Sequence, residues 1–251
     1  MPRRARKHSE SGIYHVMLRG IDRQQIFEDA SDYLMFLEIL EDCRSVSGFQ
    51  LFAYCLMGNH AHILLRVTEE RLETIFKRIG GRYVYWHNAK YQRIGPLFQD
   101  RFKSEPVEDD SYFLTVLRYI HNNPVKAGLC RKPGEYPYSS YTAYLTASDT
   151  VDTEFGLGML PGEEFARYHI LPNSDRCLEI SETKRQAVTD DQASKIIEKL
   201  THCRSISDFQ SLEEPRKKNY TQKIHNKGVS IRQISRLTGI SKGMVERWLK
   251  E

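Results

Sequence analysis

The sequence has little cysteine and lacks any long hydrophobic run. Its 251 residues include five cysteines, an odd number, and no two of them have Cys-x-x-Cys spacing. That pattern favours reduced thiols in a cytosol over a disulfide framework or a zinc finger. No segment approaches the ~20 apolar residues that span a bilayer, and the basic start leads into polar residues, unlike a signal peptide. We therefore expect a cytoplasmic protein without a membrane partner.

Charge is nearly balanced, with a formal net charge of +4, but the basic residues concentrate at the two ends. Residues 1–8 contain Arg3, Arg4, Arg6 and Lys7 and no acid. Residues 216–250 contain ten Lys or Arg residues against one acid, Glu246. Basic segments of this kind suit a polyanionic partner. The alternative for either segment alone is a solvated surface.

The hydrophobic pattern predicts an α+β domain with the element order βαββαβα. Strands are expected over residues 13–18, 49–56, 61–67 and 102–107, and helices over residues 31–46, 71–88 and 110–122. Ser31 or Asp32 would cap the first helix, and Met57-Gly58-Asn59 would form a hairpin turn. This order is that of a ferredoxin-like sandwich with an antiparallel sheet. Residues 130–150 are expected to form an ordered surface loop that wraps the core.

The C-terminal part is predicted to be a separate domain. We expect one domain over residues 1–150, an extension and linker over 151–188, and a small all-α domain over 189–251. Within the last, Ser230 and Ser241 would cap two helices joined at Gly239, as in a helix-turn-helix. An unrelated helical hairpin is the alternative. Basic residues of these helices would contact DNA, namely Arg232, Arg236, Lys242 and Arg247.

His60 and His62 form the most informative motif. Only Ala61 separates them, so a strand would place both imidazoles on one face, where they could hold a divalent cation. Farther along, Tyr119 and Asn123 have the i, i+4 spacing of one helical face. Together these residues suggest a metal-assisted tyrosine nucleophile acting on a phosphodiester. Taken alone, the histidines could be a half-buried pair and Tyr119 a core tyrosine.

Four separated stretches carry a family resemblance. They are Ile13-Tyr14-His15-Val16 with Arg19-Gly20, the run from Tyr54 to His62, the run from Gly95 to Lys103, and the run from Tyr119 to Leu129. In this order they resemble the single-tyrosine HUH transposases, most of all the branch called REP-associated tyrosine transposases. The resemblance covers about the first 145 residues. It implies a ferredoxin-like fold and a transposase that cleaves and rejoins DNA through a covalent 5′-phosphotyrosine intermediate.

The resemblance also implies roles for particular residues. Tyr119 would be the nucleophile, and His60, His62 and Asn123 would bind Mg²⁺ or Mn²⁺. Because Asn123 precedes Pro124, the helix could end there, and His121 and Asn122 are alternative ligands. Single-stranded or hairpin DNA would be bound by basic residues that neutralise phosphates, namely Arg3, Arg4, Arg6, Arg19, Arg78, Arg82, Arg93, Arg101 and Lys103. Interleaved aromatic residues could stack on bases, namely Tyr83, Tyr85, Trp86 and Tyr91.

Two other functions fit the sequence. One is a domesticated DNA-binding or regulatory protein of repetitive palindromic elements, and the other is a metal-dependent nuclease without a covalent intermediate. A covalent protein–DNA adduct would separate the transposase from both. The sequence leaves open the metal, the DNA recognised, the ligand of the helix-turn-helix, and whether the protein is a monomer or a homodimer.

Overall fold

The computed structural model describes residues 6–146, 148–173, 175, 177–178, 190–203 and 205–249. Arg3 and Arg4, two of the predicted DNA contacts, lie outside these residues. The chain divides into two compact units, Met1–Glu179 and Ile180–Glu251, and each is described by itself. Among the helices described, none combines the length and the hydrophobicity needed to cross a bilayer.

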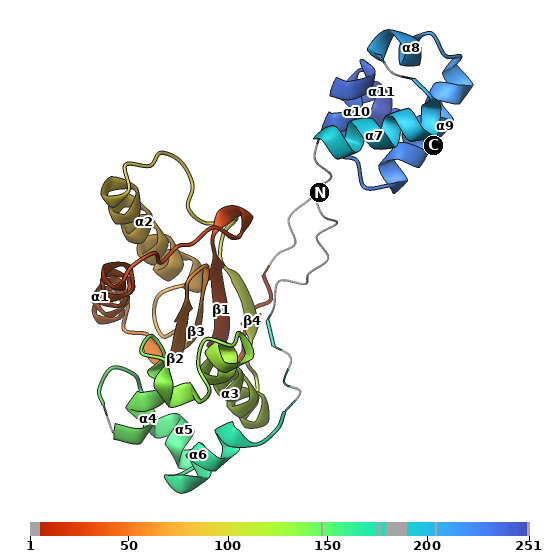
Figure 1. The fold of residues 1–251 in the computed structure, drawn as a ribbon. Coiled ribbons are helices and arrows are strands. Elements are labelled where there is room, and N and C mark those ends of the chain that lie inside the picture. The colour runs from red at the N-terminus through yellow and green to blue at the C-terminus, as the bar shows by residue number, and fades with distance from the viewer. Residues whose placement is uncertain are drawn as a thin grey trace. The chain divides into compact units, whose positions relative to one another are not determined.

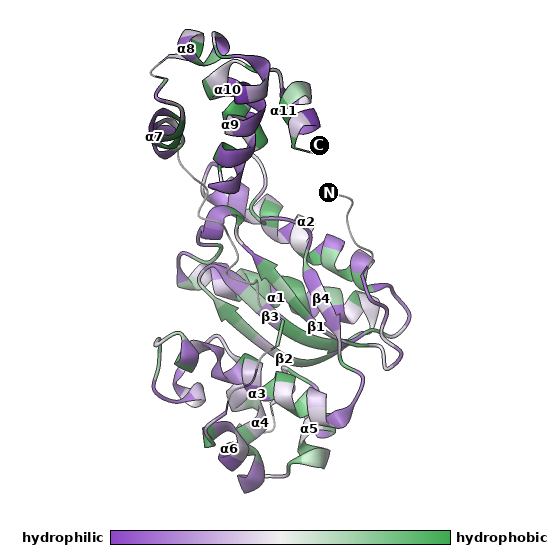
Figure 2. Ribbon diagram, turned by 90° about the vertical axis from the view of Figure 1, so that its right-hand side faces the viewer, coloured by the Kyte–Doolittle hydropathy of each residue, from purple (hydrophilic) through white to green (hydrophobic). Residues whose placement is uncertain are grey.

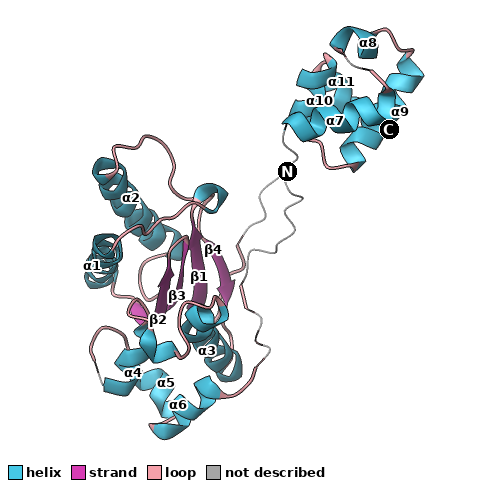
Figure 3. Ribbon diagram, in the orientation of Figure 1, coloured by secondary structure: helices cyan, strands magenta, loops and turns pink. Residues whose placement is uncertain are grey.

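The first unit is built on a four-stranded antiparallel sheet. Its strands are β1 (Ile13–Arg19), β2 (Gln50–Met57), β3 (His60–Arg66) and β4 (Lys103–Pro106), in the order β2-β3-β1-β4. Helices α1 (Ala30–Ser47) and α2 (Leu72–Lys90) cover one face, and α3 (Asp110–Lys126) covers the other (Figures 1 and 3). This is the predicted ferredoxin-like order, so the α+β fold class is confirmed.

The central strands are apolar because helices cover both of their faces. Every residue of β3 between its two ends is buried, and the hydrophobic colour covers most of β1, β2 and β3 in Figure 2, whereas β4 is hydrophilic. Helix α1 begins one residue earlier than predicted. Its cap is Asp29, whose carboxylate accepts a hydrogen bond from Ser31 N, while Asp32 at the third helical position completes a capping box. The prediction of Ser31 or Asp32 as the cap was therefore wrong, since both lie inside the helix.

Helix α3 continues past the Asn-Pro step that was expected to stop it. Pro124 lies inside the helix, which ends only at Lys126. Proline removes one backbone donor, but its fixed φ is compatible with helix, and Asn123 O still accepts from Ala127 N at 3.0 Å. Asn123 therefore keeps its helical position one turn beyond Tyr119.

Residues 130–171 pack against the core. The segment 130–150 wraps the core in an ordered way, as expected, but it contains short helices and buries Tyr141 and Tyr144, so the expectation of a loop on the surface was wrong. Residues 130–171 form η2 (Pro133–Glu135), η3 (Ser140–Thr142) and the helices α4 (Ala143–Thr146), α5 (Glu154–Met159) and α6 (Glu163–Ile170). A further turn, η1 (Ile21–Arg23), follows β1. Tyr141, Tyr144, Val151 and Phe165 are all core residues. The boundary predicted at residue 150 therefore falls inside the first compact unit.

The described part of the second unit is helical. It contains α7 (Asp190–Thr201), α8 (Ile206–Gln210), α9 (Glu214–Asn226), α10 (Ile231–Thr238) and α11 (Lys242–Trp248) around a small core. Helices α10 and α11 occur where they were predicted, with Ser230 and Ser241 as caps and Gly239 in the left-handed conformation between them. Helix α9 is mostly hydrophilic (Figure 2) and buries only Thr221 and Ile224, so hydrophobic periodicity did not reveal it.

Candidate active site

The two histidines of β3 face α3. Alternation along the strand turns Ala61 to the opposite face, where it is fully buried. The rings of His60 and His62 are nearly perpendicular, with centroids 5.1 Å apart. His60 Nδ1 lies 2.6 Å from Asn59 Oδ1, which can only accept, so this ring nitrogen donates. In the neutral ring, the lone pair of His60 then lies on Nε2.

A third histidine adjoins this pair from β1. His15 Nε2 lies 2.8 Å from His62 Nδ1, and His15 Nδ1 lies 2.8 Å from Glu105 Oε1 on β4. Strand β1 separates β3 from β4, so its side chains connect the two strands across the sheet. Glu105 also accepts a hydrogen bond from Leu178 N. His15 lies within one of the family-like motifs, but no role was predicted for it from the sequence, and Glu105 was not predicted as a site residue.

Helix α3 brings Tyr119 and Asn123 to the same place. The ring of Tyr119 meets His62 edge-on with centroids 5.6 Å apart, and it meets His15 at 5.9 Å. Asn123, one turn later, forms a side-chain hydrogen bond with His60. Lys126 completes the cluster, with its ammonium 4.7 Å from the centroid of the Tyr119 ring. The structure thus places the four proposed catalytic and metal-binding residues together.

Burial keeps both histidines neutral. It lowers the pKa of His60 to about 4, with the charge of Arg19 acting in the same direction and the hydrogen bond with Asn123 opposing it. For His62, burial lowers the pKa well below its ordinary value, helped by the neighbouring His15 and His60. A metal binds imidazole through an unprotonated nitrogen, and the lowered pKa values keep that form present at neutral pH.

Asn123 is the side chain placed to act as a third ligand. Among the described residues, no three His, Cys, Asp or Glu side chains form a group that could hold a metal ion. A cation at His60 and His62 would therefore need a neutral oxygen. Nδ2 of Asn123 is buried without a hydrogen-bond partner, and this side chain can turn its oxygen to a cation without giving up a bond from Nδ2.

The alternative ligands are engaged elsewhere. His121 contacts His169 Nε2 and Ser140 Oγ, each at 3.0 Å, through its two ring nitrogens. Asn122 donates to His169 O at 3.0 Å. Both side chains therefore tie α3 to the segments that follow it, and we do not assign them to the metal.

Several predicted DNA contacts have intramolecular partners instead. Arg78 pairs with both carboxylate oxygens of Glu70 at 2.7 Å, and Arg82 pairs with Asp42 at 2.6 Å. Arg93 donates to Gln24 Oε1. Of the interleaved aromatic residues, Tyr83 is a core residue, whereas Tyr85 is 81% exposed. The basic face of α2 is therefore largely neutralised within the unit.

Other basic residues border an apolar pocket of about 500 Å³ beside α2. Phe76, Phe98 and Phe102 line it, and Arg6, Lys77 and Arg101 lie among its lining residues. Arg6 stacks on the Phe102 ring at 3.8 Å and also pairs with Glu73. The neighbouring Lys103 is exposed at the start of β4. Aromatic rings with interleaved cations are the surface that unpaired bases use.

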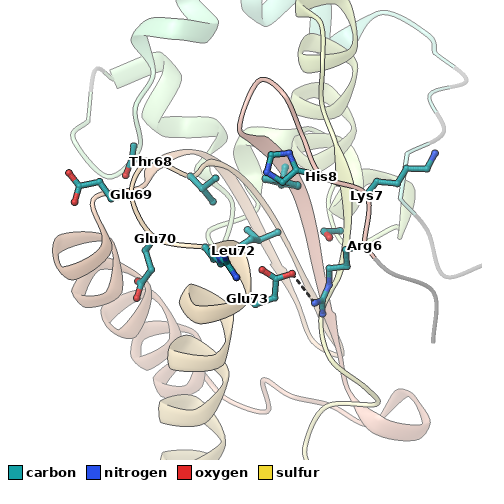
Figure 4. A pocket seen from close by; sticks show the side chains of 12 residues that line it. Arg6, Lys7, His8, Thr68, Glu69, Glu70, Leu72 and Glu73 are labelled. Carbon is teal, nitrogen blue, oxygen red and sulfur yellow. Dashed lines mark hydrogen bonds and ion pairs between the residues drawn. The ribbon is translucent and has the colours of Figure 1, made fainter. Parts of the chain in front are cut away.

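A second hollow, of about 410 Å³, has a different character (Figure 4). Glu69, Glu70 and Glu73 line it together with Arg6 and Lys7, and Arg6 reaches toward Glu73. Its lining includes none of the residues of the histidine–tyrosine cluster. Three carboxylates beside the cations leave little attraction for phosphate, so we assign it no part in DNA binding.

The basic residues predicted in the second unit lie on α10 and α11. Arg232, Lys242 and Arg247 are exposed. Arg236 pairs with Asp190, and Lys242 lies 3.4 Å from Glu246 along the same helix. Exposed pairs of this kind contribute little to stability and exchange easily for phosphate contacts.

Part of the chain is similar to known transposases. Residues 8–123, which include both histidines and Tyr119, match the family model described as Transposase IS200 like. A Haemophilus influenzae protein, assigned by name to the REP-associated tyrosine transposases, is 27% identical over 149 residues, covering 54% of this chain and 83% of the relative.

A solved structure shares the fold. It is a REP-associated tyrosine transposase bound to a REP hairpin, with a TM-score of 0.53 and 16% sequence identity, and the match covers 72% of this chain and all of that one. Over residues 8–123, just under half of its length, the chain is therefore similar to the IS200-like transposases, and it is also similar to a relative named as a REP-associated tyrosine transposase.

Proposed function

We propose that this protein is a transposase that cleaves and rejoins DNA through a covalent 5′-phosphotyrosine at Tyr119, beside a divalent cation held by His60, His62 and Asn123. One observation carries the proposal. Two side chains from β3 and two from α3 meet on the same face of the sheet, with the Tyr119 and His62 rings in contact.

The donor set fits a hard divalent cation such as Mg²⁺ or Mn²⁺. Two neutral imidazoles and one amide oxygen would leave positions open for phosphate and water. When bound, a cation neutralises the charge of a phosphodiester and polarises it toward attack. The protein itself keeps the His60 and His62 rings neutral by burying them. It also holds Asn123 on α3, one turn after Tyr119.

Tyr119 would act as the nucleophile. A bond forms between its phenolic oxygen and phosphorus while the bond from phosphorus to the 3′ oxygen breaks. The phenolic proton is transferred to the departing 3′ oxygen, which is released as a hydroxyl group. Lys126, 4.7 Å from the ring centroid, favours negative charge on the phenol and on the phosphate attached to it. Attack by another 3′ hydroxyl reverses the step, so rejoining needs no nucleotide cofactor.

DNA would be guided to the site by basic residues on the same unit. Arg19 is the β1 residue directly opposite His60 in the sheet register, so it is placed to bind the phosphate beside the cation. Arg101, Lys103 and the pocket of Phe76 and Phe98 offer a path for unpaired bases. Because a protein of this fold has been solved with a hairpin, we propose that the substrate combines a hairpin with a flanking single strand.

The second unit would add affinity for DNA. Its exposed basic residues Arg232, Lys242 and Arg247 lie on or at the start of two short helices joined by a tight turn. In helix-turn-helix proteins the second helix enters the major groove, and α11 would have that part here.

An oligonucleotide assay tests this function. We would incubate the protein and Mn²⁺ with hairpins carrying single-stranded flanks, labelled at either the 5′ or the 3′ end. We expect the 3′-labelled product to remain attached to the protein on a denaturing gel and the 5′-labelled product to be released. Cleavage without attachment would indicate a nuclease that lacks a covalent step. Binding of the hairpins without cleavage would indicate a regulatory protein.

A further inference from the structure

His15, which is buried, and Glu105, which is partly exposed, form a hydrogen-bonded chain behind His62 that the proposed reaction does not itself use. His15 is fully buried and His62 is 2% exposed, so water does not compete for their ring nitrogens. The two links are each 2.8 Å, from Glu105 to His15 and from His15 to His62. Each ring nitrogen in these two hydrogen bonds faces one partner, so the donor and the acceptor of each bond can be assigned.

Glu105 determines which nitrogen of His15 carries a proton. Oε1 of Glu105 already accepts a hydrogen bond from Leu178 N at 2.8 Å, as an ionised carboxylate does. It therefore accepts from His15 Nδ1 as well. In a neutral imidazole the other nitrogen is then an acceptor, so His15 Nε2 presents its lone pair to His62.

The position of the proton on His15 determines the position of the proton on His62. With a lone pair facing it, Nδ1 of His62 must carry the proton and donate. A neutral His62 then has its own lone pair on Nε2, the nitrogen that is not engaged with His15.

We propose that His15, oriented by Glu105, is a positioning residue that fixes the Nδ1–H tautomer of His62 and so directs its Nε2 lone pair to a divalent cation. The inference rests on the proposed metal role of His62. Ligand histidines commonly have their second ring nitrogen held by a hydrogen-bond partner, and loss of such a partner weakens metal binding by about 10–100-fold.

The tautomer can be measured without metal or substrate. We would label the histidines of the full chain with ¹⁵N, record long-range proton–nitrogen correlations at neutral pH, and assign His62 by comparison with His62→Gln. The inference predicts a protonated Nδ1 and a bare Nε2 for His62. A protonated Nε2 in the wild-type protein would overturn it, and this measurement needs no variant at His15.

A metal titration separates this inference from the proposed function. We would measure Mn²⁺ binding by calorimetry for wild type, His15→Phe and His15→Gln. The phenyl ring keeps the shape and removes the acceptor, whereas the Gln oxygen lies near the position of Nε2 and restores it. We expect the dissociation constant to rise about 10–100-fold for His15→Phe and to stay within a few-fold of wild type for His15→Gln.

The outcomes are distinct. Wild-type affinity in a folded His15→Phe protein would overturn the inference while leaving the metal site intact. Failure of the wild-type protein to bind Mn²⁺, with the expected tautomer present, would contradict the proposed metal role and leave the assignment of the tautomer standing.

Discussion

The ring of Tyr119 packs edge-on against the ring of His62, with centroids 5.6 Å apart. One residue comes from a central strand and the other from the helix that covers it, and 57 positions separate them in the sequence. Both are almost fully buried, at 4% and 2% exposure. The contact joins the proposed nucleophile to a proposed metal ligand.

Removing either imidazole should abolish cleavage. In His60→Ala or His62→Ala a cation would lose one of its two nitrogen ligands, and a loss of about 3 kcal/mol of transition-state stabilisation lowers the rate about 100-fold or more. Asn123→Ala should be milder, since water can replace one neutral oxygen. Rates would be measured on a hairpin oligonucleotide with Mn²⁺, with the exposed His8→Ala as the control. Undiminished cleavage after exhaustive chelation of the wild-type protein would remove the metal from the account.

Arg19→Ala should weaken DNA binding more than Arg82→Ala does. Arg19 lies opposite His60, and its charge already acts on that ring, whereas Arg82 is paired with Asp42. Loss of one phosphate contact should reduce the slope of log affinity against log salt by about one. Titrations at two or more salt concentrations would measure both variants. Equal slopes for the two variants would mean that Arg19 does not contact phosphate.

Stability should fall between about pH 6.5 and pH 4. Burial lowers the pKa of His169 to about 4, below the ordinary value of 6.5. Over this interval the unfolded chain binds a proton that the folded chain does not, so acid favours unfolding. The cost approaches roughly 3 kcal/mol for one such histidine. Denaturant unfolding at several pH values would measure this, and His169→Gln should show a shallower pH dependence. An unchanged slope in that variant would contradict the assignment.

Truncation should separate the roles of the two units. A chain ending at residue 178 keeps the core residues Val151 and Phe165 and should still cleave a short substrate, with weaker binding and a flatter salt dependence. A chain ending at residue 150 loses both and should be destabilised by at least about 3 kcal/mol, the cost of removing one buried Phe. Thermal unfolding and binding titrations would compare them. Equal affinity and salt slope for the 178-residue chain and the full chain would leave the second unit without a DNA-binding role.

The sequence predicted most of the fold because its signals were local. Alternating and helical hydrophobic patterns gave the order βαββαβα, and Ser230, Gly239 and Ser241 gave the ends of α10 and α11. The predictions failed where tertiary packing overrode a local sequence signal. Pro124 was expected to favour a helix end, yet α3 continues, and the tyrosines of residues 136–144 were expected in a loop, yet Tyr141 and Tyr144 are core residues.

The candidate site was only partly accessible from sequence for the same reason. His60 and His62 are adjacent on one strand, and Tyr119 and Asn123 on one helix, so spacing alone could pair them. His15 and Glu105 are 90 residues apart and meet only through the register of β1 with β4. The ion pairs of Arg78 and Arg82 likewise depend on which acids of other segments lie across from α2. Charge counts along the chain contain no such information.

The most direct test of the account is the identity of the residue attached to DNA. The wild-type protein, Tyr119→Phe and Tyr112→Phe would each be incubated with a 3′-labelled hairpin substrate and Mn²⁺, and the adduct would be mapped by digestion and mass spectrometry. Tyr112 is the matched control, because it lies two turns earlier on α3. The account predicts an adduct on Tyr119 in the wild-type and Tyr112→Phe proteins and none in Tyr119→Phe. An adduct that persists in a folded Tyr119→Phe protein would contradict it.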